Sequence, residues 1–238
     1  MAGFSQSEYE KGRLLFDKRA NDSEGLVANE KYINASIKHF EKANSPEGTV
    51  GLLRALEFKG SFVELSDKKR KKVYAKAIEI GKEALKQYPD NIGIKYYYVA
   101  NLGRYGQTIS KLNAHKEGIT DEIRNITTEI IQENPKYAEA GALRILGAIH
   151  LKIPSVPFIL DWPSNEKAKE LLTRAYDIAP ENPGNVRFYA ELLIDIGQDE
   201  KAEELLRQLL KTSPRAHRLL EDKQDLEKAQ KVYDQLAK

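Results

Sequence analysis

The sequence predicts an all-α fold, an α-α superhelix of about ten to twelve helices stacked as antiparallel pairs. Three observations predict it: one pattern of apolar residues recurs, two of its copies are separated by a fixed distance, and each copy is followed by a proline. The copies are Ala77-x3-Gly81-x2-Ala84-x4-Pro89, Ala168-x3-Leu172-x2-Ala175-x4-Pro180 and Ala202-x3-Leu206-x2-Leu209-x4-Pro214. The last two copies lie 34 residues apart at every position. A fixed period of this length is typical of stacked helical arrays.

The spacing within the pattern explains why these segments are helical. Residues four and then three positions apart lie on one stripe of a helix. Alanine on that stripe lets a neighbouring helix approach closely, and a proline a few residues later ends the helix. Residues 188–194 form a further apolar run that stops at Gly197, where glycine can adopt a positive φ, and we expect Gly106 to play the same part. One unit is therefore helix, glycine turn, helix, proline turn.

This arrangement resembles the tetratricopeptide repeat family over roughly residues 70–215. The resemblance rests on the small-x3-large-x2-small triplets, the two turn glycines and the three closing prolines. The aromatic and Leu-Gly signature of the family's first helix is poorly kept, because Val186, Tyr189 and Ala190 match it only loosely. The resemblance implies a fold of stacked helix pairs and a role in binding, since repeats of this kind serve many partners.

The remaining helices follow from apolar spacing along the chain. We expect helices at residues 5–20, 26–43, 68–87, 92–105, 137–151 and 217–237. Residues 49–65 also have helical spacing, but Gly51 and Gly60 argue against one continuous helix. Residues 108–122 form either a longer second helix or one interrupted near Gly118, with Asp121 as the cap of a new start.

We expect one repeat domain over residues 1–238. Residues 1–66 would be degenerate N-terminal repeats that cap the stack, residues 67–214 the core repeats, and residues 215–238 a C-terminal capping helix. Residues 152–164 interrupt the core as an insertion, because three prolines there forbid a regular helix. The insertion is apolar and carries the only tryptophan, Trp162. It is either a plug between repeats or a lip over a binding groove.

A second resemblance begins at this insertion. The string Pro-x2-Pro-Phe…Trp-Pro-x3-Lys-Ala, followed by Leu-Leu-x2-Ala-Tyr and Pro-Glu-Asn-Pro, is similar to exported bacterial repeat proteins. Their layout resembles the T component of TRAP transporters, a periplasmic lipoprotein that associates with solute-binding proteins. This resemblance implies a periplasmic or envelope location, with a signal or lipid anchor removed; Met1–Gln6 lacks the apolar core of a signal peptide. The cytoplasm is the alternative.

Composition excludes several classes of function. The net charge of +2, from 38 basic and 36 acidic residues, argues against a general nucleic-acid binder. No apolar run is long enough for a transmembrane segment. Cysteine is absent, so thiolate metal sites and cysteine nucleophiles are excluded. The four histidines form no metal-binding spacing and no catalytic constellation is present, so we expect neither cofactor, metal nor enzymatic activity.

One basic run stands out, Lys68-Lys69-Arg70-Lys71-Lys72. It lies at the start of a predicted helix, where the macrodipole disfavours cations. A solvated helix face is the simpler interpretation. An anionic partner or lipid headgroups would be the functional one.

The candidate binding surface is a groove formed by the first helices of the repeats. Its predicted residues combine small, aromatic and charged side chains, which leave room for a ligand. They are Tyr96, Ala100, Gly103, Arg104, Arg187, Glu191 and Ile194, with Ala142 and Leu146 beside them and Trp162 at the lip. We expect a protein or peptide partner. The alternative is a transport accessory that binds a small apolar ligand or a solute-binding protein, and the oligomeric state stays open.

Overall fold

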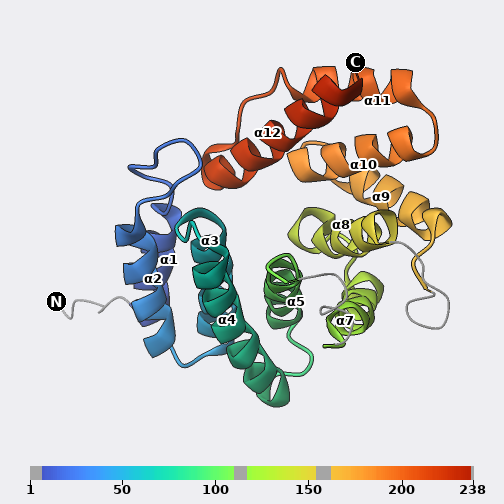
Figure 1. The fold of residues 1–238 in the computed structure, drawn as a ribbon. Coiled ribbons are helices and arrows are strands. Elements are labelled where there is room, and N and C mark those ends of the chain that lie inside the picture. The colour runs from blue at the N-terminus through green and yellow to red at the C-terminus, as the bar shows by residue number, and fades with distance from the viewer. Residues whose placement is uncertain (1–6, 110–116, 154–161, 237–238) are drawn as a thin grey trace. The chain divides into compact units, whose positions relative to one another are not determined.

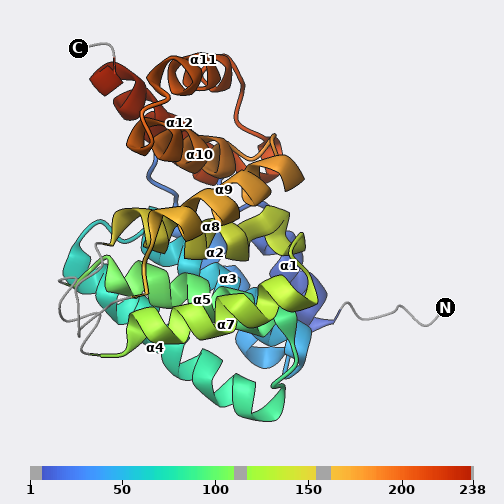
Figure 2. The ribbon, with the colours of Figure 1, turned by 90° about the vertical axis from the view of Figure 1, so that its right-hand side faces the viewer.

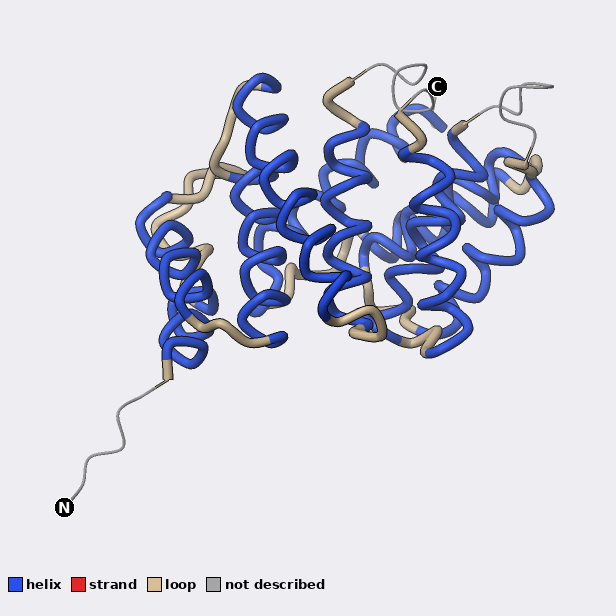
Figure 3. The backbone as a smooth tube through the Cα atoms, turned by 90° about the horizontal axis from the view of Figure 1, so that it is seen from below, coloured by secondary structure: helices blue, strands red, loops and turns tan. Residues whose placement is uncertain are grey.

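The computed structural model describes residues 7–109, 117–153 and 162–236. Within these ranges the chain forms eleven α-helices and one 3₁₀ helix, and no strand is present (Figures 1 and 3). The all-α prediction and the predicted number of helices are confirmed for this part of the chain. The chain divides into two compact units, Met1–Ile126 and Thr127–Lys238. The expected single domain with its caps therefore stays a prediction, and each unit is described by itself.

The first unit contains five helices and the start of a sixth. They are α1 (Glu8–Asp17), α2 (Glu30–Lys42), α3 (Pro46–Phe62), α4 (Asp67–Gln87), α5 (Ile92–Gly106) and the first half of α7 (Ile119–Glu133). From α1 to α5, neighbours along the chain pack against each other, and α3 also packs against α5 (Figure 1). Asn101 on α5 fixes that contact, because its amide nitrogen donates to the backbone oxygen of Leu53 at 3.0 Å.

The second unit contains the rest of α7 and five further α-helices. These are α8 (Tyr137–Lys152), α9 (Asn165–Ile178), α10 (Pro183–Asp195), α11 (Asp199–Leu209) and α12 (Leu219–Leu236), the last preceded by a 3₁₀ turn, η1 (Ala216–Arg218). Figure 2 shows α8, α9 and α10 lying one above another. The last helix, α12, packs on both α10 and α11 through apolar side chains such as Ala229 and Val232.

The recurring pattern is the packing stripe of the second helices, as predicted. It falls on α4, α9 and α11, and every one of its nine residues is buried. Ala77, Ala168, Ala175 and Ala202 are 0% exposed. Small residues are needed there because partner helices approach closely, which is the condition for a buried helix contact.

The turn residues behave as predicted with one exception. Pro89, Pro180 and Pro214 follow the ends of α4, α9 and α11, and Gly197 has the expected positive φ of 74°. Gly106 was expected to end its helix in the same way, and this prediction was wrong. Gly106 is the last residue of α5 and has no positive φ; the helix ends in a tighter turn, in which the hydroxyl and backbone nitrogen of Thr108 donate to the Tyr105 oxygen.

The structure corrects two details of the predicted helices: the effect of the glycines in α3 and the residue that caps α7. The glycines of α3 do not interrupt it: the helix is continuous, and Gly51 and Gly60 face the rings of Phe40 and Tyr74 on the neighbouring helices, with no room for a side chain. The interruption near Gly118 is confirmed, since Gly118 has φ 71° and α7 begins at the next residue. The predicted cap, Asp121, lies instead in the first turn of α7.

Candidate functional site

Charged side chains join α8, α10 and α12, the first helices of the helix pairs in the second unit. On α10, Glu191 forms a salt bridge with Arg187 one turn earlier. Its other carboxylate oxygen lies 2.5 Å from Nζ of Lys152, at the end of α8. Arg187 also binds Asp225 on α12, with 3.1 Å between Nη2 and Oδ1. These four residues, here called the α10 ladder, tie α8, α10 and α12 together.

Burial differs along the α10 ladder. The side chains of Arg187 and Glu191 are 8% and 10% exposed, whereas that of Lys152 is 54% exposed. The Arg187 guanidinium also lies over the half-buried ring of Phe188, 3.9 Å from its centroid. Because two carboxylates pair with Arg187, it is held as a structural cation, and removal of Arg187 itself would leave the largely buried carboxylate of Glu191 without this partner. Lys152 is thus the most exposed of these side chains.

The other candidate residues of the second unit pack into its core. Ile194 is half-buried against the apolar cluster that includes Val186 and Ala190. Ala142 and Leu146 are only 2% and 5% exposed, so they serve packing. These three apolar residues fill the contacts between helices and offer no polar group to a ligand.

Trp162 packs on the core of the second unit. Its ring meets that of His150 edge to face, with 5.0 Å between centroids, and it lies against the cluster of Leu143, Leu146 and Ala175. The backbone nitrogen of Ser164 donates to Nδ1 of His150 at 3.0 Å, which fixes the imidazole beside the indole. Residues 154–161, including Phe158, Ile159 and Leu160, lie outside the described residues. Whether the whole insertion is a plug or a lip therefore stays a prediction.

The candidate residues of the first unit share one face of α5. Tyr96 is buried at 8% exposure, with its ring edge-on to the next tyrosine. Ala100 and Gly103 are half-buried, and a Cβ added at Gly103 would meet open space. Nε of Arg104 donates to Glu57 on α3 at 2.7 Å. As in the second unit, the arginine of a first helix is engaged by a carboxylate of the neighbouring first helix.

The predicted residues thus fall into two sets. Tyr96, Ala100, Gly103 and Arg104 belong to the first unit, while Trp162, Arg187, Glu191 and Ile194 belong to the second. All four residues of the first set lie on α5. In the second set, Arg187, Glu191 and Ile194 lie on α10, whereas Trp162 packs on residues of α8 and α9. One groove lined by both sets stays a prediction.

A partly buried polar cluster beside α10 was not predicted from the sequence. Glu139 on α8 accepts hydrogen bonds from Asn182 and, at 2.8 Å, from Arg215. Arg215 also donates to Asp222 on α12, with Nε–Oδ2 2.7 Å and Nη2–Oδ1 2.9 Å. Asn185, fully buried, donates to three backbone oxygens and accepts from Arg144. This cluster, the α12 clasp, holds the last helix to α8 and α10.

Only part of the signal for the α12 clasp was present in the sequence. Asn182 precedes a proline at the first position of α10 and caps the helix by accepting from two backbone nitrogens. Its contact with Glu139, which lies 43 positions earlier in the chain, depends on tertiary packing and leaves no local pattern.

The carboxylates of the α12 clasp have lowered pKa values. Burial raises the pKa of Glu139, but the hydrogen bond from Asn182 and the charge of Arg215 outweigh it, so the pKa lies below the ordinary value. Burial likewise raises the pKa of Asp222, but the side-chain and backbone hydrogen bonds from Arg215 have the larger effect. The pKa of Asp222 is therefore also below its ordinary value. The clasp is therefore ionised at neutral pH.

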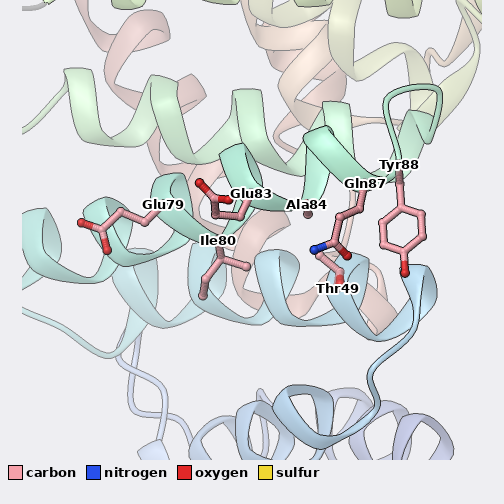
Figure 4. Close-up of a pocket in the computed structure, with 7 residues that line it drawn as sticks. All are labelled: Thr49, Glu79, Ile80, Glu83, Ala84, Gln87 and Tyr88. Carbon is pink, nitrogen blue, oxygen red and sulfur yellow. The ribbon is translucent and has the colours of Figure 1, made fainter.

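A shallow hollow of about 380 Å³ lies between α3 and α4 in the first unit (Figure 4). Ile80, Ala84 and Tyr88 give it an apolar floor, and Glu79 and Glu83 project at its rim. Thr49 on α3 lines the far wall. Its lining contains carboxylates but neither a nucleophile paired with a base nor a histidine, so it offers no catalytic constellation.

Side chains that could ligate a metal are scattered over the described residues. Nowhere in these ranges do three or more histidine, cysteine, aspartate or glutamate side chains gather as metal ligands would. His39 instead contacts Glu8, with 2.8 Å between Nδ1 and Oε2. No described helix is both long and apolar enough to cross a bilayer.

Comparison with known proteins connects this geometry to a class of proteins. Residues 164–222 match the family model of the tetratricopeptide repeat. This segment contains α9, α10, α11 and the start of α12, and hence Arg187, Glu191 and Ile194 of the candidate surface. The matched segment lies within the second unit.

Two particular proteins are similar to this chain. The chain is 35% identical over 95 residues to the TPR repeat-containing protein YpiA of Bacillus subtilis strain 168, a match that covers 36% of this chain and 22% of YpiA. The chain thus spans about a fifth of the length of this curated relative. The crystal structure of a thermophilic TPR protein from Thermus thermophilus has a similar fold, with a TM-score of 0.62, 16% identity, and coverage of 97% of this chain and 99% of that one. Together these matches support the tetratricopeptide repeat superfamily and an all-helical repeat fold, but not the resemblance to the TRAP T component.

Proposed function

We propose that the chain is a non-enzymatic interaction module that binds a protein or peptide partner on the first-helix face of its second unit. The observation that carries the proposal is the α10 ladder, which joins α8, α10 and α12 side by side through charged contacts. Three aligned helices offer a partner a broad and rigid surface. Recognition on such a surface depends on a few anchoring side chains and on charge complementarity.

The chemistry of this face favours a partner with at least one acidic group. Lys152 is an exposed cation at its edge. The ring of Phe188, which is partly buried against an apolar cluster of α9 and α10, lies under the Arg187 guanidinium. A carboxylate of the partner could share Lys152 with Glu191 without displacing the buried pair of Arg187 and Glu191. Affinity would then come from Lys152 and Phe188, while Arg187 keeps the helices in place.

The test compares two lysines of the second unit. A partner captured on the full chain is purified, and its affinity is measured by titration calorimetry for the wild type, Lys152→Glu and Lys167→Glu. Lys167 is the matched control, since it is exposed to a similar extent, 58%, but lies on α9. We expect Lys152→Glu to weaken binding about tenfold or more and Lys167→Glu to leave it unchanged. Equal affinities of the two variants, both folded by circular dichroism, would contradict the proposal.

The second candidate function is the accessory that binds a small apolar ligand. The hollow between α3 and α4 favours it, because its volume of about 380 Å³ is within the range of small-molecule sites. Charged Glu79 and Glu83 at the rim count against a purely apolar ligand. Specific binding of an apolar fluorescent probe, abolished by Ile80→Glu, would support this candidate.

The proposed location in the bacterial envelope rests on the resemblance to exported repeat proteins alone. Fractionation of cells that express the native gene would test it. Recovery in the periplasmic or membrane fraction would support the envelope, and recovery in the cytoplasm would support the alternative.

A further inference from the structure

The turn between α3 and α4 exposes apolar side chains. Leu65 in this turn is 67% exposed, the highest value among the large apolar residues of the described ranges. Val27 is 40% exposed and belongs to the loop before α2. That loop is fastened to the same end of α3, because the backbone nitrogen of Ala28 donates to the Phe62 oxygen at 2.8 Å. Two exposed apolar side chains thus lie on segments that meet at one end of the first unit.

The basic run begins two residues after this turn. Lys68, Lys69, Lys71 and Lys72 are all exposed on the first turns of α4. Lys69 lies 3.9 Å from Glu64, and the ammonium of Lys71 lies over the ring of Tyr105. Lys68 and Lys72 are one turn apart on one side of α4 and form no ion pair or hydrogen bond with any described residue. Because the helix macrodipole disfavours cations at this end, the run reduces rather than adds helix stability.

The charge of the chain is unevenly divided. Residues 1–126 contain 22 basic and 17 acidic residues, a net charge of +5, whereas residues 127–238 contain 16 and 19, a net charge of −3. Within residues 64–72 alone, five basic and two acidic residues leave +3. The small net charge of the whole chain therefore conceals a basic first unit whose positive charge is concentrated beside Leu65.

We propose that Leu65 and Lys68, Lys69, Lys71 and Lys72, here called the lysine corner, dock the protein on an anionic lipid surface. A protruding apolar residue with lysines around it fits such a surface, because the apolar side chain enters the headgroup region while the ammonium groups meet lipid phosphates. The inference uses α4 of the first unit and is independent of the partner face on α10.

The shape of the lysine corner favours a lipid surface over an acidic peptide. A peptide needs a groove in which to lie. The hollow found on α4 is lined by Gln87 and Tyr88 at the opposite end of that helix and by Thr49 at the start of α3 (Figure 4). The lysine corner consists of exposed side chains on a turn and on the first turns of α4, and such side chains can meet a flat surface without a groove.

The expected strength follows from the number of lysines. Each lysine close to an anionic bilayer strengthens binding about fivefold, so the loss of two weakens it about 30-fold. Insertion of Leu65 strengthens binding by a further factor of about ten. The attraction is screened by salt, so binding should weaken strongly when ionic strength rises from about 0.1 M to 1 M.

The experiment is flotation of the full chain with phosphatidylglycerol vesicles and with phosphatidylcholine vesicles. The test variant is Lys68→Gln/Lys72→Gln, and the matched control is Lys82→Gln/Lys86→Gln. The control removes the same charge from two exposed lysines, also four residues apart, at the other end of α4. We expect flotation with anionic vesicles alone, a loss of about 30-fold for the test variant, about tenfold for Leu65→Ser, and little change for the control.

Several outcomes would overturn the proposal. They are no flotation of the wild type with anionic vesicles at low salt, equal weakening of the test and control variants, and unchanged flotation of Leu65→Ser. Calorimetry with a glutamate-rich peptide and with inorganic phosphate completes the design. If the peptide binds the lysine corner while vesicles do not, the partner is an acidic protein. If phosphate alone saturates the lysines and displaces vesicles at millimolar concentration, the site binds free phosphate.

Discussion

Alanine substitutions at two glycines of packed neighbouring helices should differ in their effects on stability. Gly81 on α4 occupies the position of the recurring pattern that is leucine in the other copies, Leu172 and Leu206. The ring of Tyr98 on α5 fills the space instead. A Cβ built on Gly81 would lie 2.5 Å from Cδ2 of Tyr98 and 3.2 Å from its Cβ and Cγ. At Gly103 on α5, an added Cβ would meet nothing within 4 Å.

The magnitudes follow from two terms. In a helix, alanine is more favourable than glycine by up to about 1 kcal/mol, and both variants gain this term. At Gly81 the methyl group also meets the rigid part of a ring that is 0% exposed and whose hydroxyl is bound to Glu122 at 2.5 Å. Overpacking of this kind costs about 1–3 kcal/mol. Gly103→Ala should therefore stabilise by about 0.5–1 kcal/mol, and Gly81→Ala should be about 1–3 kcal/mol less stable than Gly103→Ala.

Urea unfolding followed by far-ultraviolet circular dichroism measures this difference. The two variants are compared at equal protein concentration, and unchanged slopes would show that the denatured states are comparable. If Gly81→Ala proves as stable as Gly103→Ala, the close contact between α4 and Tyr98 does not limit the size of residue 81. The reasoning from helix approach would then be refuted.

Three further predictions concern the second unit. Ala175→Leu should lower the free energy of unfolding by about 1–3 kcal/mol, because residue 175 is fully buried, and an unchanged melting temperature would argue against the packing stripe. The pKa values of Glu139 and Asp222 are lowered in the folded state, where both side chains contact Arg215. These contacts therefore stabilise the fold at pH values above the ordinary pKa values of 4.5 and 3.8, and this stabilisation is lost as the pH falls through the lowered pKa values. Urea midpoints should therefore fall in acid, and Asp222→Asn should flatten that dependence; parallel curves for wild type and variant would contradict it. Trp162 emission should be blue-shifted relative to the unfolded chain and independent of protein concentration, whereas a shift on dilution would indicate that another subunit covers the indole.

The all-helical fold was predictable because its signals are local. The spacing of Ala168, Leu172 and Ala175 sets a packing stripe within one helix, and Pro180 ends that helix a few residues later. The period of 34 residues repeats this information, so each copy supports the others. The backbone conformation of Gly106 at the end of α5 was predicted wrongly, because glycine permits a positive φ without requiring it.

The candidate surface was predictable only in part. Sequence spacing placed Arg187 and Glu191 one turn apart on a first helix, where a salt bridge between them is expected. It gave no indication that Lys152 and Asp225 would join them from α8 and α12. Periodicity identifies the exposed face of a helix, but the partners of a charged side chain there are set by helices that are distant in the sequence.

The helices, their pairing and the small residues at their contacts follow from the sequence alone, because helix spacing, turn chemistry and periodicity act over a few residues or one repeat. Three features could be known only from the packing of the helices. Arg187 is a buried cation with two carboxylate partners, Glu139, Arg215 and Asp222 form one cluster, and Leu65 is exposed beside the lysines of α4. Burial and charge pairing depend on which helices pack against each other. Contacts between residues that are dozens of positions apart leave no local pattern in the sequence.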